Sequence, residues 1–237
     1  MAAAKGQLLK IYRLLLKRFG HRGWWPGETR FEVMVGAILT QNTNWGNVEK
    51  AIREMKKRGL VEPKRLAEAD VREVEKAVKS SGYFRQKARR VKGFAKWLVE
   101  SYGGDLGKMF AKETKELREE LLEINGIGPE TADSILLYAG GKPVFVVDAY
   151  TRRSFARIGL LGEDAEYGEV QEFFEGNLPR SVELYKDFHA QIVALGKNFC
   201  KTRPRCNECP LKAICRFASI RAPAHRRPGS APGARRL

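Results

Sequence analysis

Apolar side chains recur at intervals of three and four residues along most of this chain, which places them on one face of an α-helix. The spacing predicts an amphipathic helix over residues 7–19. Residues 31–39 are apolar nearly all round and predict a buried helix capped by Thr29. The same period predicts helices that follow Asn44 and Asp70, and helices over residues 86–101, 149–158, 167–175 and 183–197. No stretch alternates apolar and polar residues for long enough to require a β-strand, so the sequence predicts an all-α fold.

Between residues 117 and 140 the pattern predicts two helices joined by a tight turn. Gly126 and Gly128 bracket the turn, where a positive φ or a close backbone approach needs a residue without a Cβ. Pro129 suits the first position of the second helix, which runs to the Gly140-Gly141 pair. Backbone N–H groups at such a helix start form a ready site for a phosphate.

One acid, Asp148, follows the apolar run of residues 144–147. A lone carboxylate in this position caps the next helix or carries out chemistry. The two roles are compatible, and we expect the capping role in either case.

The charge balance points to a polyanionic partner. Lys and Arg number 44 against 28 Asp and Glu, a net charge of +16, which suits nucleic acid better than an ordinary basic surface. A hydrophobic content of 43% is enough for one large core or two smaller ones. The N-terminus lacks the apolar core of a signal peptide, and no apolar run approaches the roughly 20 residues that span a bilayer. We therefore expect a cytoplasmic, nucleoid-associated protein with no membrane partner.

All four cysteines lie close together near the C-terminus, with the spacing C-x5-C-x2-C-x5-C. Disulfides are rare inside cells, so four clustered thiols indicate a metal site. Zinc ribbons usually separate two C-x2-C pairs by a longer gap, whereas this chain flanks one pair with single cysteines. The residues are Cys200, Cys206, Cys209 and Cys215.

These features together resemble the endonuclease III superfamily of DNA glycosylases. The resemblance rests on Gly126-Ile127-Gly128, Thr131-Ala132, an Asp 18 residues after Glu130, and the cysteines, and it covers roughly residues 28–216. It implies that the helical hairpin grips DNA phosphates and that Asp148 drives cleavage of the bond between base and sugar. It also implies a structural 4Fe-4S cluster on the four cysteines, although the first gap is one residue shorter than usual; zinc is the alternative.

The resemblance implies two helical domains on either side of a DNA-binding cleft in a monomeric protein. The first would be a six-helix, barrel-like domain over residues 28–140, with the hairpin at 117–140. The second would combine residues 1–27 with 141–217 and carry the cluster loop at 200–215. We expect residues 218–237, rich in Arg, Pro, Ala and Gly, to form a disordered basic tail.

Endonuclease III uses a lysine of the second hairpin helix as a nucleophile, and the matching position here is Glu130. A carboxylate cannot form an imine with the sugar, so the chain resembles a monofunctional glycosylase. Lys142 and Lys197 are alternative amine nucleophiles, but neither occupies the family position.

Tryptophans flank the buried helix of residues 29–40 and are candidates for binding an everted base. Together with Thr40-Gln41-Asn42-Thr43 they resemble the 3-methyladenine glycosylases of the endonuclease III type. By that resemblance, the base would be sandwiched by Trp24, Pro26 and Trp45, with Trp25 beside them. Cation–π attraction would favour positively charged, N-alkylated purines. The alternative is that these tryptophans belong to the core.

Further residues are expected to contact the DNA. Gln41 lies where family members insert a side chain into the base stack, although a plain polar helix end is the alternative. The hairpin would hold phosphates through Gly126, Ile127, Gly128, Glu130 and Thr131. Basic side chains of the cysteine loop face either phosphates or solvent; they are Lys201, Arg203, Arg205 and Lys212. Tyr150 replaces a histidine found beside the Asp in many relatives, and its role stays open.

Three functional hypotheses follow. The first is a monofunctional DNA glycosylase that removes alkylated purines from double-stranded DNA. The second is a glycosylase for mismatched thymine or uracil, or for oxidised pyrimidines, with or without strand nicking; Asn42 and Asn44 would read the base edge. The third is a non-catalytic DNA-binding module. Asp148 argues against it, because a pure binder gains nothing from an acid that faces a polyanion.

Overall fold

The computed structural model describes residues 2–221, and residue 1 and residues 222–237 lie outside the described part. The described chain contains thirteen α-helices and no strand, so the all-α prediction is confirmed. The α-helices are α1 (Ala2–Phe19), α2 (Arg30–Leu39), α3 (Trp45–Lys57), α4 (Pro63–Glu68), α5 (Val71–Ala77), α6 (Phe84–Tyr102), α7 (Leu106–Ala111), α8 (Thr114–Glu123), α9 (Pro129–Ser134), α10 (Ala149–Ile158), α11 (Tyr167–Asn177), α12 (Val182–Asn198) and α13 (Arg216–Arg221). No helix in this part is long and apolar enough to cross a membrane.

Local sequence signals explain where most helices begin. Thr29 accepts a hydrogen bond from the backbone N–H of Glu32, and Asn44 accepts one from Asn47, as their expected capping roles require. Asp70 likewise caps α5. The helices α4 and α7 were not expected, because six residues are too few to show a helical period.

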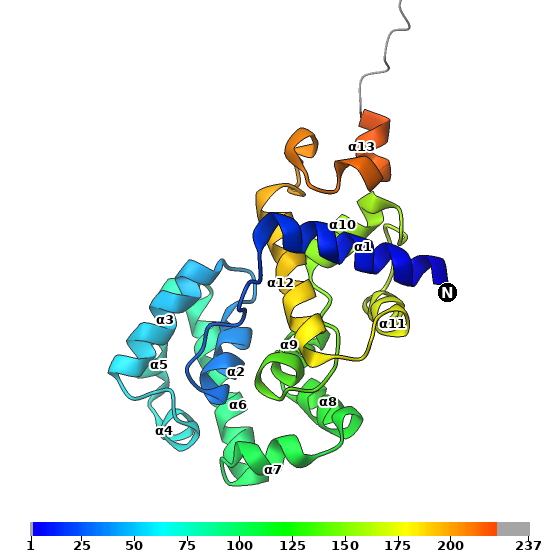
Figure 1. Cartoon of the computed structure of the whole chain (residues 1–237). Coiled ribbons are helices and arrows are strands. Elements are labelled where there is room, and N and C mark those ends of the chain that lie inside the picture. Colours follow the sequence, from blue (N-terminus) through cyan, green and yellow to red (C-terminus); the bar gives the residue numbers. More distant parts are fainter. Residues whose placement is uncertain (1, 222–237) are drawn as a thin grey trace, which may run out of the picture.

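The helices pack in two groups (Figure 1). In one group α6 packs against α2, α4, α5 and α7, and α8 packs against α9. In the other, α12 packs against α1 and α10. The two groups are joined where a π-helical turn (Ile135–Ala139), which continues α9, contacts both α2 and α12. The domain boundaries given above stay a prediction.

Helix α2 is buried along residues 31–39, as the apolar pattern predicted. Its C-terminal carbonyl at Leu39 accepts a hydrogen bond from the ammonium group of Lys87, at 2.9 Å. The same ammonium group donates to the carbonyl of Ser81, at 2.6 Å. Although Lys87 is only 1% exposed, both bonds satisfy its charge and fix the point where α2 ends.

The end of the chain differs from expectation. Helix α13 covers residues 216–221, and Ala218 is buried, so a disordered tail that begins at residue 218 is wrong for these first positions. The remaining residues of the expected tail, 222–237, lie outside the described part.

Candidate active site

A buried, extended segment delivers Asp148 to the site. The side chains of residues 144–147 are buried in the core. The segment pairs with no strand, and side chains of α11 satisfy its backbone instead: Glu175 accepts from the N–H of Phe145 at 2.7 Å, and Gln171 donates to the carbonyl of Phe145 at 2.8 Å. These contacts fix the backbone immediately before the carboxylate.

Asp148 is the N-cap of α10, as expected. Its Oδ1 accepts from the backbone N–H of Thr151 at 2.7 Å and from the Thr151 hydroxyl at 2.8 Å. Its Oδ2 lies 3.7 Å from Nε2 of His189, too far for an ordinary hydrogen bond, so that contact is electrostatic. Burial by itself would raise the pKa of Asp148, but His189 and the two Thr151 donors outweigh burial and hold the pKa below its ordinary value. The carboxylate is therefore ionised at neutral pH.

The hairpin consists of α8, a turn at residues 124–128, and α9. Gly126 has a φ of 86°, and a Cβ there would meet the side chain of Arg90 at 2.4 Å, so this position needs glycine. Gly128 differs: its backbone is extended (φ −98°, ψ 180°), and a Cβ would meet open space. Ile127 is buried, at 5% exposure, and anchors the turn. Pro129 begins α9, as predicted.

A buried network around Asp133 connects the hairpin to α11. Arg118 donates to both carboxylate oxygens, at 2.7 and 3.1 Å. Tyr167 and Gln171 donate to Oδ2 at 2.7 and 2.8 Å. Asp133 is 0% exposed, and the sequence offered no means of distinguishing it from a surface residue at a helix start.

A cleft of about 760 Å³ opens beside Asp148, and it brings together many residues singled out in the sequence. The predicted residues that line it come from the loops on both sides of α2, from the hairpin, from the start of α10 and from α12; they are Trp24, Trp25, Gln41, Asn42, Asn44, Trp45, Glu130, Thr131, Asp148, Tyr150 and Lys197. Pro26, Gly126, Ile127 and Gly128 do not line it.

The three tryptophans form one closed cluster. The ring centroids of Trp24 and Trp45 are 4.9 Å apart in an edge-to-face arrangement, and those of Trp25 and Trp45 are 5.4 Å apart. A base stacked between two parallel rings needs roughly twice the van der Waals contact distance of about 3.5–4 Å. The expected sandwich between Trp24 and Trp45 is therefore not formed in this structure, because each ring packs on the other.

Gln41 lies at the end of α2 but is not a free side chain. Its Nε2 donates to the carbonyl of Gly126 at 2.9 Å and to the hydroxyl of Thr131 at 3.0 Å. Its Oε1 accepts a hydrogen bond from Arg90. In this structure Gln41 ties α2 to the hairpin turn.

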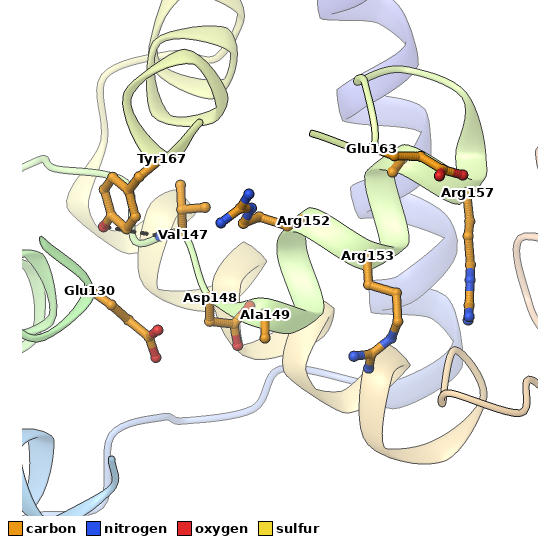
Figure 2. Close-up of a pocket in the computed structure, with 10 residues that line it drawn as sticks. Glu130, Val147, Asp148, Ala149, Arg152, Arg153, Arg157, Glu163 and Tyr167 are labelled. Carbon is orange, nitrogen blue, oxygen red and sulfur yellow. Dashed lines mark hydrogen bonds between the residues drawn. The ribbon is translucent and has the colours of Figure 1, made fainter. Parts of the chain in front are cut away.

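Glu130 and Asp148 line a second pocket, of about 580 Å³, which adjoins the cleft (Figure 2). Figure 2 shows both carboxyl groups directed toward the same space. The Glu130 side chain reaches solvent, although many protein atoms surround its carboxyl group. This burial, and then the negative charge of Asp148, raise the pKa of Glu130 to about 7.

The candidate amines and loop cations have different surroundings. Lys142 donates to the carbonyl of Lys112 at 2.6 Å and does not line the cleft. Lys197 does line it, with its Nζ 5.8 Å from the centroid of Trp24. Lys201 and Arg203 are exposed. Arg205, by contrast, forms an ion pair with Glu208 at 2.7 Å.

The cysteine loop connects α12 to α13 and is fastened to α10. Arg153 donates to the carbonyl of Cys200 at 2.8 Å, and Arg157 donates to the carbonyls of Lys201 and Thr202 at 2.6 and 3.2 Å. Both arginines therefore link this loop to the helix that Asp148 caps.

All four cysteines are free thiols and half-buried. Burial, with a further contribution from the neighbouring cysteines, raises the pKa of Cys209 to about 11. Four thiolates repel one another, and a bound cation removes that repulsion. In residues 2–221 no three His, Cys, Asp or Glu side chains are already arranged as a metal site. The fit to a cluster therefore rests on the donor set, four thiols on one loop.

Several site residues were missed at the sequence level. His189 lies on α12, far from Asp148 in sequence, and its Nδ1 is 2.7 Å from the hydroxyl of Tyr138. Arg90, on α6, donates a hydrogen bond to Gln41 and lies against Gly126, and both partners are far from it in sequence. Histidine is scarce in this chain, with three residues, which was the one signal that could have drawn attention to His189.

Comparison with known proteins agrees with this geometry. Residues 35–180 match the family model described as HhH-GPD superfamily base excision DNA repair protein. A protein of Methanocaldococcus jannaschii, MJ1434, named as a candidate DNA repair glycosylase, is 49% identical over 210 residues, which are 88% of this chain and 95% of the relative.

Two solved structures share the fold. The 3-methyladenine DNA glycosylase MagIII of H. pylori, bound to 1,N6-ethenoadenine, is 30% identical with a TM-score of 0.72, over 82% of this chain and 97% of that chain. A non-covalent endonuclease III–DNA complex is 25% identical with a TM-score of 0.77, over 92% of this chain and 97% of that chain.

This chain belongs to the HhH-GPD superfamily of base excision DNA repair proteins, and it is a DNA glycosylase of that family. The predicted resemblance to the endonuclease III superfamily is thereby confirmed.

Proposed function

We propose that this protein is a monofunctional DNA glycosylase that hydrolyses the N-glycosidic bond of alkylated purines in double-stranded DNA. The observation that carries the proposal is an ionised carboxylate, Asp148, beside a cleft lined by tryptophans. As the bond to the base breaks, positive charge develops on the sugar. A fixed negative charge beside the cleft stabilises that charge.

Glu130 supports the monofunctional assignment. The second hairpin helix directs a carboxylate, not an amine, into the cleft. Water is then the nucleophile, and no imine links enzyme and DNA. Lys197 is the lysine among the cleft-lining residues, but it lies on α12, at Trp24.

The tryptophan cluster supports an aromatic or cationic base. Because Trp24 and Trp45 pack on each other, an everted base either stacks on the outer face of the cluster or separates the rings. N-alkylated purines carry a positive charge and a weakened glycosidic bond, so they need little acid assistance. The MagIII structure, which holds an ethenoadenine, supports a purine substrate for a chain of this fold.

The hairpin and the charge support the DNA contact. The turn presents the start of α9, and the open space beside Gly128 leaves its backbone accessible to a phosphate. The residues proposed for the contact are Gly126, Ile127, Gly128, Glu130 and Thr131, with Lys201 and Arg203 on the cysteine loop. Arg205 would first have to leave Glu208. Gln41 would enter the base stack only after releasing its hydrogen bonds to the hairpin.

A 4Fe-4S cluster on Cys200, Cys206, Cys209 and Cys215 is part of the proposal. It would supply structural rigidity to the loop and no step of the hydrolysis. Purified protein should be yellow-brown and contain iron and sulfide; colourless protein loaded with zinc would refute this part.

One observation favours a second candidate, a glycosylase for uracil or mismatched thymine. The Lys197 ammonium group lies over Trp24. A cation there repels a cationic base but can donate a hydrogen bond to a carbonyl oxygen of a neutral pyrimidine. Asn42 and Asn44 line the same cleft and can read the edge of such a base.

A panel of duplexes, each with one damaged or mismatched base, separates the candidates by the free base released. Release of 3-methyladenine or ethenoadenine supports the first, and release of uracil or thymine alone supports the second. Borohydride should trap no covalent adduct with wild-type protein, with endonuclease III as the positive control. Efficient trapping that disappears in Lys197→Met would show instead that Lys197 is a nucleophile.

A further inference from the structure

Glu130 is a carboxylate without a partner in the middle of the site. It lies in the first turn of α9 and lines both the cleft and the adjoining pocket, as Asp148 does. In the part of the chain that the structure describes, its carboxyl group has no hydrogen bond and no ion pair. Solvent reaches it directly. The positive end of the α9 dipole would favour an acid at this position. It would not explain why the side chain points toward the same space as a second acid.

The two carboxylates have different surroundings. Asp148 is held by two donors of Thr151 and is close to His189. Glu130 is left free to exchange a proton. Two neighbouring acids whose surroundings separate their proton affinities commonly divide the labour of a hydrolysis, one stabilising charge and the other moving a proton.

We propose that Glu130 is a second catalytic carboxylate, the general base that activates the water which attacks the sugar. This rests on the proposed function. The C1′–N bond breaks, and its electron pair stays with the base, so a cationic purine leaves as a neutral molecule. The water oxygen bonds to C1′, and one water proton moves to Glu130, which later releases it to solvent. Asp148 remains ionised throughout and faces the positive charge on the sugar.

The raised pKa of Glu130, about 7, agrees with a base that works near neutral pH. The group is ionised above this pH, so base release should rise with pH through about 7 and then level off. Other charged and titratable groups line the same two spaces as Glu130, and these are Asp148, Tyr150, Arg152, Arg153, Arg157, Glu163, Tyr167, His189 and Lys197. Because several of them titrate or carry charge, the pH limb must be assigned by substitution.

The test compares Glu130→Gln with wild type in single-turnover base release across pH 5–9, on the best substrate of the duplex panel. A positioned general base contributes typically 10²–10⁴-fold. We therefore expect the rate at pH 8 to fall by about 100-fold or more, the limb near pH 7 to disappear, and DNA affinity to stay within a few-fold. Glu119→Gln is the matched control, since Glu119 is an exposed acid on the first hairpin helix that does not line the cleft.

Glu130→Ala with added formate gives an independent readout. A small carboxylate that enters the vacated space should restore part of the rate, which a merely structural role would not allow. Unchanged rates and an unchanged pH limb in Glu130→Gln, with no formate rescue, would overturn the proposal. If the panel releases only neutral pyrimidines, the proposed substrate is wrong, and a rate that falls above pH 7 would then overturn the general-base role separately.

Discussion

Two buried aspartates, Asp133 on α9 and Asp148 at the start of α10, differ in which carboxylate oxygens the protein leaves without a donor. Asp133 receives four hydrogen bonds, from Arg118, Tyr167 and Gln171, and is 0% exposed. Asp148 receives two, both on Oδ1 from one threonine, and is 8% exposed. Its Oδ2 faces His189 and the cleft.

The difference separates stability from function. A carboxylate whose two oxygens both accept hydrogen bonds from the protein serves to hold elements together, and Asp133 holds the hairpin to α11. A carboxylate with one oxygen free toward solvent-filled space keeps a negative charge available for another molecule. Both aspartates are buried, so burial alone does not separate their roles. Their hydrogen-bond partners do.

The largest effect should come from a substitution of Asp133, the aspartate with the structural role. Asp133→Ala leaves Arg118 as an uncompensated, partly buried charge and removes a hydrogen-bond partner of Tyr167 and Gln171. Removing one member of such a pair costs about 3–5 kcal/mol of the free energy of unfolding. Chemical denaturation should show this loss, while base release per folded molecule at low temperature stays near that of wild type.

The double variant Asp133→Leu, Arg118→Met is the matched control. It removes both charges and keeps apolar volume, so it should recover much of the lost stability. A loss of base release in this stable double variant would contradict the separation of the two aspartates.

Asp148→Asn should have the next largest effect, and this effect should be on the rate of base release and not on stability. The amide keeps the shape of the side chain but cannot stabilise the positive sugar, so base release should fall by roughly 10²–10³-fold, about 2.7–4 kcal/mol of transition-state stabilisation. Quenched single-turnover assays measure the rate, and fluorescence anisotropy should show unchanged DNA affinity. Turnover at the wild-type rate would remove Asp148 from the mechanism.

The sequence predicted Asp148 because its position after an apolar run, together with the hairpin, is a local pattern. Thr29, Asn44 and the start of α9 were predictable for the same reason, since caps and proline act within one turn. Asp133 carried no such pattern. Its partners Arg118 and Gln171 are brought to it only by packing, as His189 is brought to Asp148.

For some residues that were correctly expected at the site, the sequence could not predict how their side chains are arranged. Trp24 and Trp45 do line the cleft, but composition cannot tell two rings that hold a base from two rings that pack on each other. Gln41 was expected to be available for DNA, and its bonds to Gly126 and Thr131 depend on a hairpin that lies far along the chain. In both cases the decisive distances belong to tertiary structure.

Trp45→Leu tests the aromatic lining of the cleft beside Asp148. It keeps an apolar side chain, although a smaller one, and removes the aromatic face, so it should weaken release of the preferred base by about 1–3 kcal/mol, the usual worth of stacking on one base. The loss should appear in kcat/KM for the lesion and much less in affinity for undamaged duplex. Trp97→Leu is the control, because Trp97 packs on Phe94 and Tyr102 and does not line the cleft. Equal losses in both variants would mean that Trp45 serves only the core.

The smallest expected effect comes from Thr151→Val, which removes one of the two hydrogen bonds that Asp148 accepts from Thr151. The valine has nearly the same shape but lacks the hydroxyl that donates to Oδ1 at 2.8 Å, while the backbone N–H remains. The free energy of unfolding at neutral pH should fall by about 0.5–1.5 kcal/mol, as for one hydrogen bond. Because that donor helps to lower the pKa of Asp148, its loss raises the pKa. In the Glu130→Gln background, where the limb near pH 7 is absent, the acid-side loss of base release should therefore begin at higher pH. Thr151→Ser keeps the hydroxyl and should leave the acid limb in place. If the acid limb does not move in Thr151→Val, the backbone N–H of Thr151 and the nearby His189 are sufficient to keep Asp148 ionised.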